Sequence, residues 1–272
     1  MTNNPQQRAF SRYLIFGYGV FSYAMFFGVF LYAIAFLGNL YTPRSIDADP
    51  VGPVGLAVVV DLGLLALFAV QHSVMARPAF KRWWTRFIPP AAERSTYVLF
   101  SNAAMIALFA FWQPIGGVIW DVAAQPTRSI IFAFYFIGWA VLFYATCLIN
   151  HFDLFGLRQV WMHLRGLEYV APEFHEPGLY KVIRHPIYLG WLMIFWCTPT
   201  MTVAHLLFAV ATTAYIFFAI QLEERDLIAA HGDVYRDYRR RVRMITPLPK
   251  SAPAADAPAS NATASESLAA SR

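Results

Sequence analysis

The sequence predicts an all-α integral membrane protein with about five to six transmembrane helices, the last two of which form a helical hairpin. Of its 272 residues, 58% are hydrophobic and only 14% are charged, and the mean hydropathy is +0.46. The apolar residues are gathered in long blocks, and the basic residues lie between these blocks. Soluble domains carry about 25% charged residues, so the composition indicates a membrane protein.

Five apolar blocks follow one another along the chain. The first, second and fourth are residues 13–37, 54–75 and 130–149, and each has roughly the 20 residues that a helix needs to cross a bilayer. The third, residues 97–112, is slightly shorter. Because the first block is too long for a cleavable signal peptide and no small-residue cleavage pattern follows it, we interpret it as a true first span.

The fifth block, residues 187–222, has basic segments on both sides and must therefore enter the membrane and return. Thr198-Pro199-Thr200 supplies the break between its two arms. At a rise of 1.5 Å per residue the first arm covers only about 15 Å, so it begins earlier or stops inside the bilayer. We expect the arms to pack on each other, because a half-length arm alone would leave polar backbone in lipid.

The basic residues predict the orientation of the chain. Lys and Arg are retained on the cytoplasmic side of a membrane, and all of them except Arg44 and Arg128 fall in segments on one side. Both termini are therefore expected in the cytoplasm. This sorting and contact with anionic lipid account for the net charge of +5, and no nucleic-acid partner is predicted.

Residues 1–250 are predicted to form a single multi-pass membrane domain. Residues 251–272 are rich in Ala, Ser and Pro and are predicted to be a disordered tail, because they hold too few apolar residues for a core. Cys147 and Cys197 are expected near opposite ends of their helices, too far apart for a disulfide. No Cys or His spacing typical of a metal site occurs, so no metal is predicted.

Polar residues gather at the cytoplasmic edge in three clusters, and their common side predicts one site. The clusters are Gln71-His72 with Arg77, Asn150-His151-Phe152-Asp153 with Arg158, and the two ends of the last hairpin. We call these ends its feet: the first foot is the chain at Arg184-His185-Pro186, and the second foot is the chain at Glu223-Glu224. Each residue also has a structural explanation, since helix ends need caps and arginines extend to lipid headgroups. Asp61 lies roughly 16 Å of helix away from His72 and is interpreted as a polar contact between helices.

The feet of the hairpin carry charge of both signs. Pro186 suits the first turn of a helix, and a helix N-terminus beside Arg184 attracts a carboxylate or a phosphate. Glu223 and Glu224 end the second arm, where adjacent carboxylates are costly unless they are solvated or bind a cation or hydroxyl groups. The aromatic face of Tyr188 can hold a cation. The feet therefore suit a ligand with both charges.

Taken together, these residues resemble the cofactor-binding half of the isoprenylcysteine carboxyl methyltransferase superfamily. The resemblance is carried by Gly178-Leu179-Tyr180, Arg184-His185-Pro186, Tyr188, Gly190, Glu223-Glu224, His231-Gly232-Asp233, Tyr235 and Tyr238. Within the superfamily, residues 12–247 are similar to the NnrU-like branch. This closer resemblance rests on residues 71–77, 150–159, 199–202 and 221–226.

The resemblance implies a bacterial inner-membrane enzyme that takes a methyl group from S-adenosyl-L-methionine and transfers it to a small thiol. Methanethiol is the expected acceptor and dimethyl sulfide the expected product. The feet and the C-terminal segment are then expected to bind the donor on the cytoplasmic side. The implied cofactor-binding residues are Tyr180, Arg184, His185, Pro186, Tyr188, Leu189, Gly190, Glu223, Glu224, Tyr235 and Tyr238.

Residue types agree with that implication. Arg184 and the helix N-terminus suit the carboxylate of the donor, and Glu223 or Glu224 suits its ribose or ammonium group. Tyr235 or Tyr188 suits the adenine or the sulfonium. Each pairing is a hypothesis that binding measurements on single variants can reject.

Methylation of a thiol requires that the thiol lose its proton, so a base or a cation is needed at the sulfur. His151 and His72 are the candidates that titrate near neutral pH, and we expect His151, oriented by Asp153, to accept the proton. Arg158 is the alternative, as a cation that stabilises the thiolate directly. The candidate catalytic residues are therefore His151, His72, Asp153 and Arg158.

Three other functions are left open by the sequence. The chain could methylate another acceptor, such as a prenylcysteine carboxylate or a lipid, which requires a cavity that admits a long lipid. It could be an oxidoreductase related to sterol reductases, which would bind NADPH and not S-adenosylmethionine. It could also be a non-catalytic NnrU-like membrane protein, which would bind neither. The sequence predicts no oligomeric state.

Overall fold

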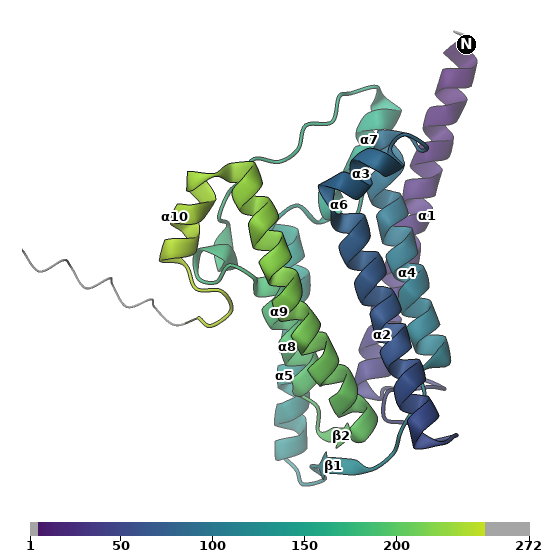
Figure 1. Cartoon of the computed structure of the whole chain (residues 1–272), viewed down its shortest axis with the longest axis vertical. Coiled ribbons are helices and arrows are strands. Elements are labelled where there is room, and N and C mark those ends of the chain that lie inside the picture. The colour runs from purple at the N-terminus through teal and green to yellow at the C-terminus, as the bar shows by residue number, and fades with distance from the viewer. Residues whose placement is uncertain (1–4, 248–272) are drawn as a thin grey trace, which may run out of the picture.

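The computed structural model describes residues 5–247, which form a bundle of long helices (Figure 1). Five helices in this part of the chain are long and apolar enough to cross a membrane, and a sixth apolar helix, α8 (Pro186–Trp196), is shorter. The five are α1 (Pro5–Gly38), α2 (Val54–Ala76), α4 (Glu93–Phe111), α5 (Thr127–Leu148) and α9 (Val203–His231). The prediction of an all-α membrane protein is confirmed, while the predicted tail of residues 251–272 lies outside the described residues.

Short elements cover the two ends of the bundle (Figure 1). At one end, β1 (Val118–Asp121) pairs antiparallel with β2 (Thr200–Thr202). At the other end lie α3 (Pro78–Trp84), η1 (Pro90–Ala92), α6 (His151–Leu154), α7 (Leu157–Arg165), η2 (Gly178–Lys181) and α10 (Asp233–Arg241). We call this second end the site end, because all three polar clusters lie there.

The predicted hairpin is present, and its first arm is short. Helix α8 (Pro186–Trp196) begins at the proline, and after a turn that contains β2 the chain returns as α9. The arms contact each other, but α8 packs most extensively against α5. This close approach depends on glycine, because a Cβ on Gly190 would lie 2.8 Å from the Cβ of Leu142 and 2.9 Å from the carbonyl oxygen of Gly138.

Gly138→Ala is expected to destabilise the protein, because the new Cβ would lie 2.9 Å from the Cβ of Met193 and 3.0 Å from the carbonyl oxygen of Gly190. Overpacking of this kind costs about 1–3 kcal/mol. Thermal unfolding in detergent should show a lower midpoint for this variant. Gly28→Ala is the matched control, because a Cβ at Gly28 meets nothing within 4 Å. Equal midpoints for the two variants would show that the α5–α8 contact does not need glycine.

The end opposite the site is tied together by two buried carboxylates. Asp61 is fully buried, and its Oδ1 accepts a hydrogen bond of 2.9 Å from the backbone N–H of Gln113, just beyond α4. Asp61 therefore makes a polar contact, as expected, but with the backbone of the loop after α4 and not with another helix. Asp47 accepts from Thr202 Oγ1 at 2.6 Å and lies 2.9 Å from Nδ1 of His205. These contacts fasten the loop after α1 to the start of α9.

Candidate functional site

A buried carboxylate, Glu224, lies at the centre of the site end. Its Oε1 accepts from Nε of Arg184 at 2.8 Å and lies 3.2 Å from Nε2 of His185. Its Oε2 lies 3.0 Å from Nε of Arg239. Only 3% of the Glu224 side chain is exposed, so these cationic and imidazole partners replace the water that the carboxylate has lost. The contact joins the first foot, the second foot and α10.

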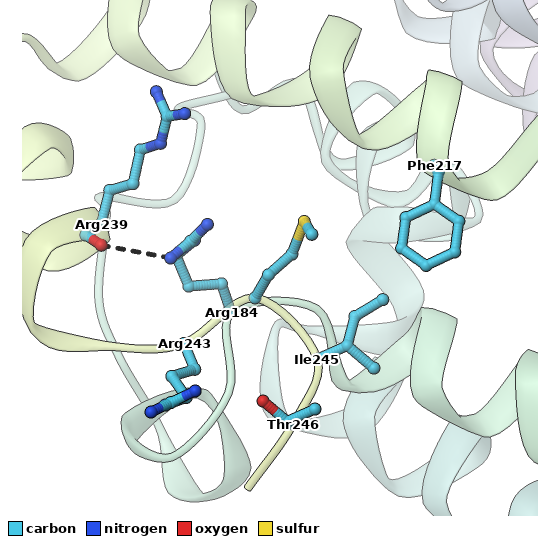
Figure 2. A pocket seen from close by; sticks show the side chains of 7 residues that line it. Arg184, Phe217, Arg239, Arg243, Ile245 and Thr246 are labelled. Atoms are coloured by element: carbon cyan, nitrogen blue, oxygen red, sulfur yellow. Dashed lines mark hydrogen bonds between the residues drawn. The ribbon is translucent and has the colours of Figure 1, made fainter. Parts of the chain in front are cut away.

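The segment after α10 runs beside the first foot. The backbone N–H groups of Arg184 and His185 donate to the carbonyl oxygens of Arg243 and Met244, at 2.8 Å and 3.1 Å. Arg184 also donates from its side chain to the carbonyl oxygens of Arg239 and Val242, and Figure 2 shows the first of these bonds. Both feet and the C-terminal segment thus form one unit, although they are separated by about sixty residues of sequence.

A pocket of about 550 Å³ opens beside this unit (Figure 2). Its wall combines three arginines with apolar side chains. The lining residues are Arg184, Phe217, Arg239, Arg243, Met244, Ile245 and Thr246. Guanidinium groups bind carboxylate and phosphate well, so the lining suits an anionic ligand that also carries apolar surface.

Glu223 differs from its neighbour Glu224. Its Oε2 is buried and has no hydrogen-bond partner among the described residues, and Nδ1 of His185 lies 3.8 Å away. A buried carboxylate oxygen without a donor is costly, so this oxygen is suited to a hydroxyl or ammonium group from a ligand. Glu224 is already satisfied by its protein partners. The structure therefore separates two carboxylates that the sequence left equivalent.

The predicted tyrosines have different surroundings. Tyr235 and Tyr238 are buried against Phe174, and Tyr238 donates to the carbonyl oxygen of Tyr180 at 2.7 Å. Burial raises the pKa of both buried phenols, which stay neutral. These contacts hold α10 against the chain before the first foot. Tyr188 is only partly buried, and its ring centre lies 5.6 Å from that of His185.

Three further predicted residues serve the start of α8. Pro186 is buried at the first position of the helix. Leu189 is partly buried, and Gly190 faces α5 as described above. Their positions give them a structural reason to be present, whether or not a ligand binds nearby.

His72 on α2 is bound by two residues of α4. The hydroxyl oxygen of Tyr97 lies 2.7 Å from its Nε2 and 3.0 Å from its Nδ1, and Oγ of Ser101 lies 3.2 Å from Nδ1. The hydroxyl of Ser101 donates to the carbonyl oxygen of Tyr97, so its oxygen is left to accept from His72. We therefore assign the proton of His72 to Nδ1, which leaves Nε2 to accept a hydrogen bond from Tyr97.

His151 is held in a parallel way by α1 and α5. Its Nε2 lies 2.9 Å from the hydroxyl oxygen of Tyr23, and its Nδ1 lies 2.8 Å from Oγ1 of Thr146. Thr146 donates to the carbonyl oxygen of Phe143, which again places the histidine proton on Nδ1. Burial lowers the pKa of His151, so the imidazole is neutral at pH 7.

A second pocket, of about 440 Å³, lies at His151. It is lined by Cys147, Leu148, Asn150, His151, Phe152, Pro172 and His175. The same segment that supplies Pro172 and His175 also carries Phe174, which packs on Tyr235 and Tyr238. The chain between α7 and η2 thus connects the surroundings of His151 to those of the feet.

The expectation that Asp153 orients His151 is wrong. Asp153 accepts from Arg158 at 3.0 Å and from the hydroxyl of Tyr169 at 3.0 Å, while His151 is bound by Tyr23 and Thr146. The reason is geometric, because residues two apart on a helical turn such as α6 point in different directions. Arg158 is engaged by Asp153, and both residues serve the turn between α6 and α7.

Both histidines border one group of aromatic side chains. The rings of Phe26 and Phe155 stack at 3.9 Å, and the ring of Phe155 lies 4.8 Å from that of His151. The same two phenylalanines pack against a small core that contains Tyr97. The His72 side is fastened to α9 as well, through Ser73 with Tyr215 at 3.0 Å and Arg77 with Asp226 at 2.8 Å.

Sequence reasoning missed Tyr23, Tyr97, Thr146 and Arg94. The first three stand inside apolar blocks, where aromatic and small hydroxyl residues are common in membrane helices. Position along the helix was a signal for Tyr97 and Thr146, since each lies within about two turns of the helix end that faces the polar clusters, whereas Tyr23 lies about five turns from the start of α1. Position alone does not show which of them meets a histidine.

The chain is 52% identical over 238 residues to the methanethiol S-methyltransferase of Mycobacterium tuberculosis, a match that spans 88% of this chain and 98% of that protein. It is 49% identical over 237 residues to the methanethiol S-methyltransferase of Crocosphaera subtropica, spanning 87% of this chain and 93% of the relative. It is 33% identical over 175 residues to nurim of Sus scrofa, spanning 61% and 66%. No family model and no solved structure matches the chain.

Proposed function

Because this chain belongs to the family of the methanethiol S-methyltransferases, we propose that it transfers a methyl group from S-adenosyl-L-methionine to methanethiol and releases dimethyl sulfide. The observation that carries the acceptor and the reaction type is the match at about 50% identity over nearly the whole length of the Mycobacterium relative. The prediction of a thiol methyltransferase from the sequence agrees with it. No finding supports the three alternative functions.

The donor is proposed from the chemistry of the feet. S-adenosylmethionine carries a carboxylate, an ammonium group, ribose hydroxyls, an adenine and a sulfonium. The arginine-lined pocket at Arg184 fits the carboxylate, and the partnerless Oε2 of Glu223 fits the ribose or the ammonium. Tyr188 offers an aromatic face to the adenine or the sulfonium. Glu224 is used by Arg184, His185 and Arg239, so its role is to hold them in place.

The orientation is proposed from the distribution of charge. The site end carries nearly all basic residues, so we place it on the cytoplasmic side of the bacterial inner membrane. The donor is water-soluble and reaches the feet from the cytoplasm. Methanethiol is small and apolar, so it can reach the aromatic side chains between the two histidines from the bilayer.

The reaction is favoured in a site from which water is excluded. A thiolate attacks the methyl carbon, and the positive sulfonium becomes a neutral thioether, so charge disappears in the transition state. A low-dielectric site favours such a step over bulk water, provided that the thiol has lost its proton. His72 and His151 are the proposed candidates for the proton acceptor, since both have an Nε2 that accepts a hydrogen bond.

Binding of the donor tests this function directly. The purified protein in detergent is expected to bind S-adenosylmethionine, measured by calorimetry or with a labelled ligand, and to show no binding of NADPH at the same concentration. The opposite pattern would favour the oxidoreductase alternative and contradict the proposal.

A further inference from the structure

We propose that the acceptor thiol is deprotonated at Tyr97 and His72, with Arg94 stabilising the thiolate. This inference rests on the proposed methyl transfer. It adds the position of the acceptor sulfur and two residues that act on it, Tyr97 and Arg94. It also ranks the two histidines. Four observations support it: a hydrogen-bonded pair, its link to the donor-binding feet, a nearby cation and the different surroundings of His151.

The Tyr97–His72 pair is arranged to receive a proton. The Tyr97 hydroxyl lies 2.7 Å from Nε2 of His72, and Nδ1 of His72 is held by Ser101. Because Nε2 accepts from the phenol, a proton that reaches the phenol oxygen can be passed on to the imidazole in one short step. Tyr97 is 8% exposed, so bulk water does not compete for this bond.

The pair also lies toward the feet of the hairpin. The hydroxyl of Tyr188 contacts the carboxylate of Glu223, and the charge of Glu223 acts on the phenols of both Tyr188 and Tyr97. Tyr215 is bonded to Ser73, the residue after His72. The partnerless carboxylate oxygen of Glu223 and the phenol of Tyr97 therefore belong to one neighbourhood, as methyl transfer requires of donor and acceptor sites.

Arg94 supplies a positive charge at the same place. Its guanidinium carbon lies 5.1 Å from the centre of the Tyr97 ring, and its Nε donates to the carbonyl oxygen of Leu154 at 2.7 Å. Its charge opposes a positive charge on His72, so the imidazolium formed in the step depends on the neighbouring thiolate for its stability. A fixed cation favours thiolate over thiol, and burial strengthens that effect.

His151 has different neighbours. Its hydrogen bonds go to Tyr23 and Thr146, and its ring contacts are with Tyr23, Phe26, Phe143, Phe152 and Phe155. These residues belong to α1, α5 and the turn around α6, whereas the feet lie on α8 and α9. We therefore assign His151 to the wall of its own pocket, and His72 to the chemistry.

The S–H proton moves to the oxygen of Tyr97 as the phenol proton moves to Nε2 of His72, which leaves thiolate and imidazolium. The sulfur lone pair forms the new bond to the methyl carbon, and the bond from that carbon to the sulfonium sulfur breaks. Its electron pair stays on the donor sulfur, which becomes a neutral thioether. The imidazolium then returns its proton to solvent.

Tyr97→Phe is the decisive variant, because it keeps the ring and removes the hydroxyl. With methanethiol its kcat is expected to fall on the order of 100-fold, the usual contribution of a positioned proton-transfer group. The Kd for S-adenosylmethionine should stay within about twofold. With 2,2,2-trifluoroethanethiol, whose thiol ionises more readily, the loss should be about tenfold or less, and a merely structural role of Tyr97 would not produce this difference.

Two phenylalanine variants serve as comparisons. Tyr18→Phe also removes the hydrogen bond of a phenol, since Tyr18 donates to Thr96 at 2.9 Å. It should leave kcat unchanged with both thiols. Tyr23→Phe removes the matching bond of His151 and should cost less than about tenfold in kcat. A larger loss in Tyr23→Phe than in Tyr97→Phe, or an equal loss of Tyr97→Phe with both thiols, would overturn the inference. Wild-type protein without thiol methylation would instead reject the proposed function.

Arg94→Met gives an independent test that does not depend on the Tyr97 variant. It removes the charge and keeps a side chain of similar length. A fall of about tenfold in kcat with methanethiol, with unchanged donor affinity, is expected from the loss of one stabilising charge. Full activity of Arg94→Met would contradict its role at the thiolate.

Discussion

Glu224→Leu is expected to lower the free energy of unfolding by about 3–5 kcal/mol, because it leaves the buried guanidinium of Arg184 without its carboxylate. Arg184 and His185 are both less than 10% exposed and both contact Oε1 of Glu224. Arg239 contacts its other oxygen. Thermal unfolding in detergent measures the loss. The variant is also expected not to bind S-adenosylmethionine, since the unit that holds the pocket is broken.

A double variant distinguishes charge burial from packing. Arg184→Met combined with Glu224→Leu removes both charges, and replacing a whole buried ion pair with apolar side chains is often neutral for stability. We therefore expect the double variant to regain much of the lost stability but not donor binding, because Arg184 lines the pocket. Wild-type stability of Glu224→Leu alone would show that this buried cluster does not hold the site end together.

Glu223→Gln is expected to weaken binding of S-adenosylmethionine roughly 30-fold, which corresponds to the loss of about 2 kcal/mol from a hydrogen bond to a charged group. Its Oε2 has no hydrogen-bond partner among the described residues, and the nearby Nδ1 of His185 and hydroxyl of Tyr188 can still donate to an amide oxygen. The thermal midpoint should therefore stay near that of the wild type. Calorimetric titration of the purified protein measures the affinity.

Glu168→Gln is the control for this change, because it removes an exposed carboxylate in the chain after α7. It should alter neither affinity nor stability. If Glu223→Gln binds the donor as tightly as this control, Glu223 does not contact the donor, and its partnerless oxygen needs another explanation.

The span positions were predictable from the sequence because hydrophobic length is a direct physical requirement of the bilayer. The hairpin was predictable for a related reason, since basic segments flank residues 187–222 on both sides and Thr198-Pro199-Thr200 interrupts them. The extensive packing of α8 on α5 was not predictable from the sequence. It depends on Gly138 and Gly190 facing each other, and the sequence does not show which helices are neighbours.

The polar site was predictable only in part. The charges of the feet indicated that Arg184 and the two glutamates belong together, and the structure joins Arg184 to Glu224. The difference between Glu223 and Glu224 could not be foreseen, because adjacent residues on a helix face different surroundings. Asp153 was assigned to His151 from proximity in sequence, whereas the tyrosines that bind the two histidines come from helices far away along the chain.

The central claim is tested most directly by headspace gas chromatography with mass detection on membranes that contain the full chain. The membranes are supplied with methanethiol and with S-adenosylmethionine labelled at its methyl group. We expect labelled dimethyl sulfide from the wild type and far less from Glu223→Gln at limiting donor. Absence of labelled dimethyl sulfide from wild-type membranes that bind the donor would contradict the proposed acceptor, and absence of donor binding would contradict the methyl-transfer account itself.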